Sequence, residues 1–419
     1  MQRSRSVKRK LACRVMWILA LGTLAACGGG GGGGGAPAPV APSPPPPLDS
    51  QELGSRDNLL FWTPAQQQYS YRNMELIFPT RAVSRMAGSP HPLYELTSSP
   101  LDLSTFRYTF QGASYSLEDF INRNRVAGLI VVKDGRILVE RYNFGHAAAS
   151  KWTSFSVAKS VTSMLVGVAV RDGHLTLDDP LTQYLPQLLN TAYEGVTIRH
   201  LMQMSSGVAW NEDYDDPNSD VVRNGSAMRN GGGTPALISY MAALPRTAPP
   251  GTRFNYNTGE THLVGVVLRT ALNQNLSTYL SEKIWSAFAM ESDAFWMLST
   301  DNGDELAGCC ISATLRDYAR LGIFAMRNGV LQNGLATLPD GWMQQSTTPA
   351  PTASDYGYLW WLTGSGNYSA SGVFGQTIQV YPQDDTVIAM QSFWPAEGGD
   401  GNYSGHRAAV SAALRAVLP

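Results

Sequence analysis

The chain has 419 residues, of which 43% are hydrophobic and 15% are charged, and it contains 10 Trp and 18 Tyr. This composition excludes a disordered or fibrous protein and supplies enough apolar side chains for a large core. The formal net charge is -2, which gives no electrostatic reason to expect binding to nucleic acid.

The first 26 residues have the pattern of an export signal. Six basic residues and no acidic residue precede an apolar run from Val15 to Ala26 that is too short to span a bilayer. Without them, 25 of the 31 Lys and Arg remain against 33 Asp and Glu, so the mature chain is mildly acidic. The run Leu24-Ala25-Ala26-Cys27 resembles the lipobox of bacterial lipoproteins, in which the Cys is acylated. The alternative is an ordinary signal peptide cut at an Ala-rich site.

We therefore predict a lipoprotein signal at 1–26 and a membrane anchor through lipid on Cys27. Because Gly28 rather than Asp follows the Cys, the analogy with lipoprotein sorting favours the bacterial outer membrane, on its periplasmic face. Residues 27–50, rich in Gly, Pro and Ala, form a linker. Residues 51–126 have an irregular pattern and are expected to wrap around the main domain at 127–419.

The remaining cysteines are few. Cys13 leaves with the signal, and Cys309 and Cys310 are adjacent. Because a disulfide between neighbouring residues is strained, we expect these two to be separate, small buried side chains.

Regular elements begin with an apolar strand at Gly128–Val132, an Asp-Gly turn and a returning strand at Ile137–Tyr142. Apolar residues at intervals of three and four predict a helix from about Ser156 to Asp172, stopped by Gly173. The later elements that the pattern predicts are helices at Ile198–Met204 with Thr197 as N-cap, Thr261–Leu272, Arg316–Arg327 and Arg407–Val417, and strands at Tyr356–Leu362, Gln376–Tyr381 and Thr386–Gln391.

Strands at both ends of this region and helices between them predict an α+β fold. We expect the terminal segments to pair into one antiparallel sheet, flanked by helices, with a mostly helical insertion.

The first chemical motif is Ser156-Val157-Ala158-Lys159. Positions i and i+3 at a helix start share a face, so the Lys159 amine can reach the Ser156 hydroxyl. A serine needs an adjacent base to become a nucleophile, and burial together with the helix N-terminus lowers the pKa of a lysine toward that task. A helix start with a snorkelling lysine is the alternative, but this is the chain's sole Ser-x-x-Lys and the lysine lies among apolar residues.

Two further segments extend the pattern. Pro250 to Gly259 makes a turn before a helix and contains Tyr256, which could present its phenol to a leaving group or be a core aromatic. Ala370-Ser371-Gly372-Val373 leads into a strand, where glycine permits close approach of a substrate backbone and an N–H could complete an oxyanion hole. A simple bulge is the alternative there.

In this order, the three segments resemble the Ser-x-x-Lys, Tyr-x-Asn and Lys-Thr-Gly motifs of the β-lactamase and penicillin-recognising serine hydrolases. The resemblance extends from about Gly128 to the C-terminus. The branch that the chain looks closest to is that of the class C β-lactamase-related esterases and 6-aminohexanoate-dimer hydrolases, on the strings Trp152 to Ser160, Trp210 to Pro217 and Tyr356 to Trp361.

The resemblance implies a β-lactamase/transpeptidase-like fold, a serine hydrolase domain at 127–419 and a small-molecule ester or amide substrate, without a cofactor or metal. It implies Ser156, Lys159 and Tyr256 as catalytic residues, and the N–H groups of Ser156 and Val373 as the oxyanion hole. The positions that it implies for substrate binding are Tyr214, Thr258, Ala370 and Gly372.

Two departures favour linear substrates over β-lactams. Thr258 stands in place of the Asn of Tyr-x-Asn, and Ala370 stands in place of the Lys of Lys-Thr-Gly, where it offers no charge to the carboxylate of a β-lactam. β-Lactamase or D-alanyl-peptidase activity, and a silent binding lipoprotein, remain alternatives.

The sequence lacks the motifs of other hydrolase classes and of calcium-binding proteins. No Gly-x-Ser-x-Gly string supports a Ser-His-Asp hydrolase. The acidic run Glu212 to Asp220 lacks the glycine and terminal glutamate of a calcium loop. We expect that run to be a solvated loop, with reception of a cationic substrate group as the alternative.

Overall fold

The computed structural model describes residues 53–85, 96–394 and 402–419. The predicted signal, the linker and Cys27 lie outside the described residues. No helix in these three ranges is both long and apolar enough to cross a membrane. The strands are β1 Thr80–Val83, β2 Thr97–Ser98, β3 Arg107–Phe110, β4 Ala113–Ser116, β5 Val126–Lys133, β6 Arg136–Tyr142, β7 Trp152–Thr153, β8 Ala294–Met297, β9 Ile311–Ala313, β10 Trp361–Gly364, β11 Asn367–Gly372, β12 Gln376–Tyr381 and β13 Thr386–Ser392.

The helices fall before, between and after these strands. The α-helices are α1 Pro64–Ser70, α2 Leu117–Arg123, α3 Val157–Arg171, α4 Leu181–Tyr184, α5 Ile198–Met202, α6 Asp220–Ala227, α7 Gly233–Ala242, α8 Thr258–Leu272, α9 Leu276–Leu280, α10 Leu315–Met326, α11 Trp342–Ser346 and α12 Asn402–Val417. Three shorter turns matter for the site, namely η1 Arg56–Phe61, η4 Met228–Gly232 and η6 Val373–Gly375.

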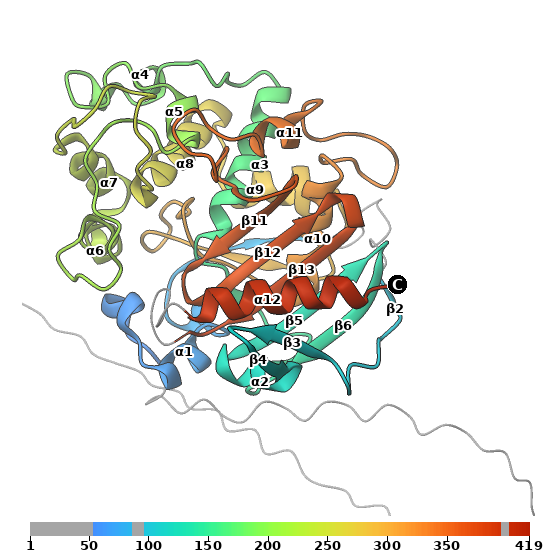
Figure 1. Cartoon of the computed structure of the whole chain (residues 1–419). Coiled ribbons are helices and arrows are strands. Elements are labelled where there is room, and N and C mark those ends of the chain that lie inside the picture. Colours follow the sequence, from blue (N-terminus) through green and yellow to red (C-terminus); the bar gives the residue numbers. More distant parts are fainter. Residues whose placement is uncertain (1–52, 86–95, 395–401) are drawn as a thin grey trace, which may run out of the picture. The chain divides into compact units, whose positions relative to one another are not determined.

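A seven-stranded sheet forms the centre of the fold (Figure 1). Its order is β10-β11-β12-β13-β5-β6-β2, antiparallel throughout except that the short β2 runs parallel to β6. The two ends of the main domain meet where Ala389 of β13 lies opposite Ile130 of β5. The predicted α+β fold, with one sheet built from both ends of the domain, is confirmed.

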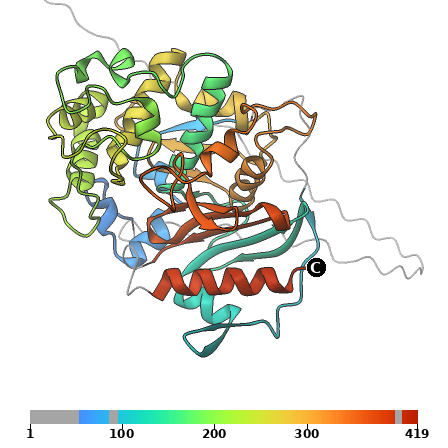
Figure 2. The same cartoon turned by 45° about the horizontal axis from the view of Figure 1, so that its top comes forward.

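The two faces of this sheet are covered by different helices, because successive side chains of a strand point to opposite sides. Leu129 and Val131 of β5 belong to the smaller core with α2 and α12, whereas Ile130 and Val132 belong to the larger core with α3 and α10. Figure 2 shows α12 lying along one face of the sheet.

Helices α4 to α9 form a helical part between the strands β7 and β8, in agreement with the expected insertion (Figure 1). A second sheet, of order β1-β8-β9-β7, lies beside the start of α3. It includes β1 from the N-terminal segment, which pairs with β8.

Most predicted elements are confirmed, with ends that differ by a few residues. The exception is the strand expected at Tyr356–Leu362, because β10 begins only at Trp361. The preceding aromatic residues are buried in turns, and Leu359 has a left-handed backbone (φ 60°). The sequence pattern of a compact turn with buried aromatic residues is thus easily mistaken for that of a strand.

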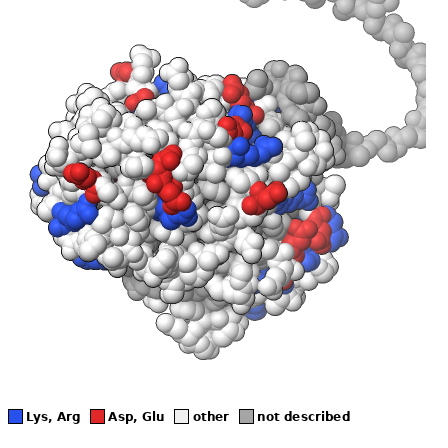
Figure 3. Space-filling model, turned by 90° about the horizontal axis from the view of Figure 1, so that it is seen from above, with Lys and Arg blue, Asp and Glu red and all other residues white. Residues whose placement is uncertain are grey.

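The charged residues at the surface are mixed in sign. On the face seen in Figure 3, Lys and Arg lie in small groups beside Asp and Glu, and no broad patch of one sign covers it.

Candidate active site

Ser156 lies immediately before the first turn of α3, as its motif predicts. Phe155 has a left-handed backbone (φ 44°), so the chain turns sharply from β7 into the helix. The Lys159 Nζ lies 2.9 Å from the Ser156 Oγ, and only 9% of Ser156 is exposed. The i, i+3 spacing therefore brings the hydroxyl and the amine into direct contact.

Lys159 is buried and fully hydrogen-bonded. Only 1% of the residue is exposed, and burial lowers the pKa of Lys159 to about 8, against the opposing influence of Glu212. Besides Ser156, its Nζ donates to Thr258 Oγ1 at 2.9 Å and to the Gly308 carbonyl at 3.0 Å. A low pKa makes a neutral amine accessible near neutral pH, which is what a lysine base requires.

Gly308 is itself held by a buried histidine. The Gly308 N–H donates to His262 Nδ1 at 3.2 Å. Burial and the neighbouring Lys159 lower the pKa of His262 to about 3, so this ring is neutral and accepts the bond. His262 fixes the loop whose carbonyl receives Lys159.

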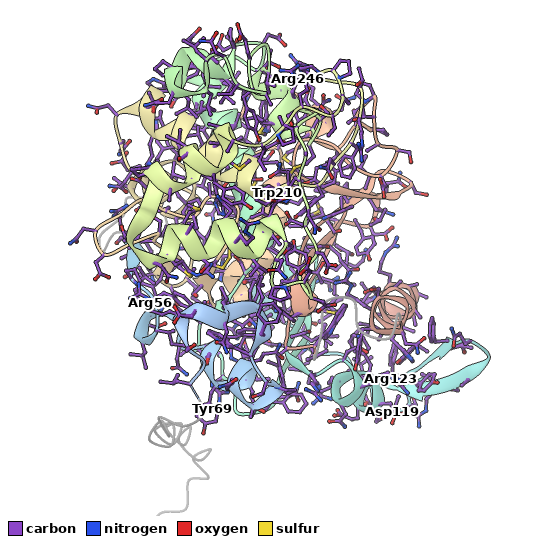
Figure 4. The ribbon with its side chains drawn as sticks, turned by 90° about the vertical axis from the view of Figure 1, so that its left-hand side faces the viewer. Arg56, Tyr69, Asp119, Arg123, Trp210 and Arg246 are labelled. Atoms are coloured by element: carbon purple, nitrogen blue, oxygen red, sulfur yellow. A yellow bond between two sulfur atoms is a disulfide. The ribbon has the colours of Figure 1, made fainter. Side chains whose placement is uncertain are left out.

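Glu212 is the residue that the sequence assigned wrongly. Its carboxylate accepts from the Thr258 N–H at 3.0 Å and from the hydroxyl of Thr258. It also accepts from the Tyr214 hydroxyl at 2.6 Å and from the Trp210 Nε1. Asp213 in the same run is exposed, as expected. Glu212 instead reaches inward because four donors compensate the desolvation of its charge. Figure 4 shows Trp210 within the helical part.

The directions of these hydrogen bonds fix the orientation of the Lys159 amine. An ionised Glu212 can only accept, so the Thr258 hydroxyl donates to it and must accept from Lys159. The Gly308 carbonyl can also only accept. A neutral Lys159 therefore uses both of its N–H bonds on these partners, and its lone pair points at the Ser156 Oγ.

Tyr256 lies in the loop before α8, next to the same amine. Its ring stacks on Trp361, with centroids 5.6 Å apart and planes at 21°, and the edge of Tyr356 contacts it as well. The Lys159 Nζ is 5.0 Å from the Tyr256 ring centroid. The structure thus brings together the three residues that the sequence proposed as catalytic.

The loop after β11 approaches the nucleophile from the opposite side. A side chain at Gly372 would place its Cβ 3.0 Å from the Ser156 nitrogen and 2.6 Å from the Ser154 oxygen, so only glycine fits. Val373 follows and lines the same space as Ser156. The backbone at Gly372 therefore lies against that of Ser154 and Ser156, on the wall where the oxyanion hole is expected.

Two cavities meet at Ser156. The first has a volume of about 380 Å³ and lies on the side of Tyr256. It is lined by Ser156, Glu212, Tyr214, Tyr256, Trp361, Ser371, Gly372, Val373, Phe374, Trp394, Ser404 and Arg407. The second has a volume of about 60 Å³ and lies toward the N-terminal segment. It is lined by Leu59, Leu60, Phe155, Ser156, Tyr214, Val221, Gly225, Met228, Arg229, Thr258, His262, Met297, Leu306, Gly308, Cys309 and Val373.

The four residues expected to bind substrate differ in position. Tyr214 lines both cavities and Gly372 lines the first. Thr258 lines the second, but its hydroxyl is engaged by Lys159 and Glu212. Ala370 is 1% exposed and lines neither cavity. It sits behind the cavity wall, within the larger core.

Arg407 is a cation that sequence reasoning missed. It comes from α12, lines the first cavity, and its guanidinium lies 5.2 Å from the Trp394 ring centroid. Burial lowers the pKa of Arg407 to about 10. Ala370 itself offers no charge, as expected, but α12 brings the cation of Arg407 to the wall of the first cavity.

The expectation of two separate buried cysteines is also wrong. A disulfide joins Cys309 to Cys310, in the loop that follows Gly308. The chain turns sharply here, with Cys310 at φ 72°, and Cys309 faces the second cavity. Elsewhere in the described ranges, no group of three or more His, Cys, Asp or Glu residues is arranged to hold a metal ion.

Comparisons of this chain with a family model, with known sequences and with solved structures agree with one another. A family model described as Beta-lactamase matches residues 117–412. A 6-aminohexanoate-dimer hydrolase of Paenarthrobacter ureafaciens is 26% identical over 382 residues, covering 85% of this chain and 94% of that protein. A solved structure from Bacillus anthracis, described as a candidate 6-aminohexanoate-dimer hydrolase, has a TM-score of 0.76 at 23% identity and covers 88% of this chain and 98% of its own.

A family VIII carboxylesterase shares the fold with a TM-score of 0.55 at 15% identity, over 71% of this chain and 96% of its own. The family match covers more than half of the chain, and the geometry at Ser156 agrees with the chemistry that this fold supports. The chain belongs to the β-lactamase family and is a serine hydrolase.

Proposed function

We propose that this protein hydrolyses carboxylic esters or linear amides through an acyl-enzyme on Ser156. The observation that carries the proposal is the closed set of hydrogen bonds around Lys159. These bonds leave the lone pair of the neutral amine one partner, the Ser156 hydroxyl. A pKa of about 8 makes that neutral amine available near physiological pH.

In the first half-reaction, the Ser156 Oγ bonds to the substrate carbonyl carbon while its proton moves to the Lys159 Nζ. The carbonyl oxygen becomes an oxyanion, stabilised by the N–H groups of Ser156 and Val373. Tyr256, beside the lysine, gives its phenolic proton to the leaving oxygen or nitrogen and takes a proton from Lys159. The bond from carbon to the leaving group then breaks, and the acyl group stays on Ser156.

In the second half-reaction, water takes the place of the leaving group. The same Lys159–Tyr256 pair accepts a proton from the water as its oxygen bonds to the acyl carbon. The Ser156 Oγ–carbon bond breaks, the serine recovers its proton, and a carboxylic acid leaves.

Linear substrates are favoured by the relatives and by the walls of the first cavity. The names of two relatives specify the 6-aminohexanoate dimer, a linear amide, and a structural neighbour is a carboxylesterase. Tyr214 lies beside Tyr256, where it could contact a leaving amide or ester oxygen. Arg407 supports the second candidate, a β-lactamase or D-alanyl-peptidase, because it offers a partner to a substrate carboxylate.

The catalytic assignment is tested with Ser156→Ala. We expect kcat/KM for p-nitrophenyl butyrate to fall by several orders of magnitude, as the loss of a nucleophile does in other serine hydrolases. Ser163→Ala is the matched control, because Ser163 lies on the same helix and its buried hydroxyl has no hydrogen-bond partner among the described residues. Mass spectrometry with a slow ester should find the acyl adduct on Ser156, and an adduct on another residue would exclude the assignment.

Substrate choice is tested by comparing kcat/KM for nitrocefin with that for p-nitrophenyl butyrate. We expect ester hydrolysis to be faster by a wide margin, because Thr258 is held by Lys159 and Glu212 and has no amide to offer a β-lactam side chain. Efficient nitrocefin turnover with little ester turnover would favour the second candidate.

We also propose that the protein is exported and anchored through lipid on Cys27, from the lipobox resemblance alone. Cys27→Ser should then release the protein from the membrane fraction. A variant that stays membrane-bound, together with a wild-type protein that carries no lipid mass, would contradict the anchor.

A further inference from the structure

Arg229 is a positive charge in the wall of the second cavity. It belongs to η4, in the helical part, and it is the one Lys or Arg among the described residues that line this space. The other walls are mostly apolar and include Leu59 and Leu60 of η1, which packs against η4. A cation is therefore brought into a mostly apolar recess that opens on Ser156.

The described residues do not satisfy the hydrogen-bonding capacity of this arginine. Its Nε is buried without a partner, and no hydrogen bond joins its guanidinium to the described part of the chain. Two charges of the N-terminal segment influence it with opposite signs, namely Asp57 and Arg56. Figure 4 shows Arg56 where that segment meets the helical part. A buried donor without a partner is costly, so a ligand that accepts from it would be bound favourably.

The position of Tyr256 decides which half of the substrate meets Arg229. The proposed mechanism needs the leaving group beside Tyr256, and Tyr256 lines the first cavity but not the second. The acyl group, attached to the same carbonyl carbon, then extends into the second cavity. A volume of about 60 Å³ suits a short chain of a few carbons, since a single water needs roughly 10–15 Å³ on this measure.

We propose that Arg229 binds a carboxylate at the far end of the acyl group, so that the preferred substrates are monoesters or monoamides of short dicarboxylic acids. An arginine fork pairs with a carboxylate through two parallel hydrogen bonds. The same charge repels an acyl chain that ends in an ammonium group, as the amino end of a 6-aminohexanoate unit does. This inference rests on the proposed function and specifies its substrate class.

Three methyl esters with matched chain length test the inference: methyl pentanoate, monomethyl glutarate and methyl 4-(trimethylammonio)butanoate, whose quaternary nitrogen cannot attack the ester. We expect wild-type kcat/KM, measured by proton release at constant pH, to be about tenfold higher for the glutarate ester than for the pentanoate. The trimethylammonio ester should be the poorest of the three. Equal rates for all three, or a preference for the cation, would overturn the proposal.

Substitution of the arginine then locates the effect. In Arg229→Met, the ratio of the glutarate rate to the pentanoate rate should fall about tenfold, whereas Arg229→Lys should retain part of the preference. The matched control is Arg223→Met, an exposed arginine one turn and a half earlier in the same helical run. A uniform loss on all three esters in Arg229→Met would show a structural role only and would overturn the proposal.

The wild-type measurement separates this inference from the proposed function. Hydrolysis of methyl pentanoate without any charge preference would refute the role of Arg229 and leave the esterase intact. Failure to hydrolyse any of the three, and p-nitrophenyl butyrate as well, would refute the proposed function itself.

Discussion

The surroundings of Lys159 and the walls of the two cavities contain cations that differ in their hydrogen-bond partners. The Lys159 amine has three hydrogen-bond partners from three separate segments of the chain. Arg229 and Arg407 form no hydrogen bond with the described residues, although partial burial lowers the pKa of both. The hydrogen bonds of the reaction centre are formed without substrate, whereas the two arginines in the cavity walls still have N–H groups that can donate to a ligand. A fixed centre suits catalysis by preorganised groups, and open donors suit recognition.

Of the substitutions that test this contrast, removal of the lysine base is expected to lower activity the most. Lys159→Met should lower kcat/KM for p-nitrophenyl butyrate by about 10²- to 10⁴-fold, the range for the loss of a general base. Lys151→Met, at a neighbouring lysine that packs on Phe295, should stay close to wild type. If Lys159→Met kept most of its activity, the base would have to be another group, with Tyr256 the first to examine.

The orientation of the amine is tested at Thr258. Thr258→Val removes the hydroxyl that accepts from Lys159 and donates to Glu212. We expect kcat to fall about ten- to a hundredfold, because a hydrogen bond to a charged group contributes roughly 1.5–3 kcal/mol. Thr258→Ser keeps the hydroxyl and should lose no more than a few fold. Equal losses in both variants would point to packing rather than to the hydrogen bond.

In the wall of the first cavity, Arg407 should affect the binding of anionic ligands but not the proton transfers at Ser156. Arg407→Met is expected to weaken inhibition of p-nitrophenyl butyrate hydrolysis by a carboxylate-bearing cephalosporin about tenfold. Arg415→Met, on the same helix but paired with Asp384, is the control. An unchanged inhibition constant in Arg407→Met would mean that the drug carboxylate does not reach α12.

The smallest expected effect is a shift in pH dependence. The neutral form of Lys159 is the active one, so kcat/KM should rise with pH and reach half of its maximum near pH 8. Glu212 raises the pKa of Lys159, so Glu212→Gln should move this rise to lower pH. Asp215→Asn, an exposed acid of the same run, should leave it in place. A shift to higher pH in Glu212→Gln would contradict the assigned electrostatics.

Local patterns predicted the parts of the site that depend on local geometry. Ser156 and Lys159 meet because a helix brings i and i+3 together, and the sequence contains that spacing. Tyr256 could be placed beside them only through the family resemblance, since it comes from a loop nearly a hundred residues later. Strands β5, β6, β12 and β13 of the main sheet were predictable because each carries its own apolar run, whereas β11 has none and was not predicted.

Contacts made by tertiary packing could not be predicted in the same way. Glu212 looks like its acidic neighbours in sequence, and only the fold shows that four donors surround it. Arg407 lies on a C-terminal helix whose relation to β11 no local pattern reveals. Arg229 likewise shares a cavity with Ser156 only because of the way η4 packs, which no local pattern reveals.

Leu59 and Leu60 lie well before the stretch that the family model recognises, which begins at residue 117. Both nevertheless form part of the wall beside the nucleophile. We therefore expect substrate selectivity to depend partly on residues outside the domain by which the family is identified. Two members with the same catalytic residues can differ in substrate because of what precedes that domain. We expect an exchange of N-terminal segments between relatives to change the wall of the second cavity, and with it substrate preference, while every reacting group stays in place.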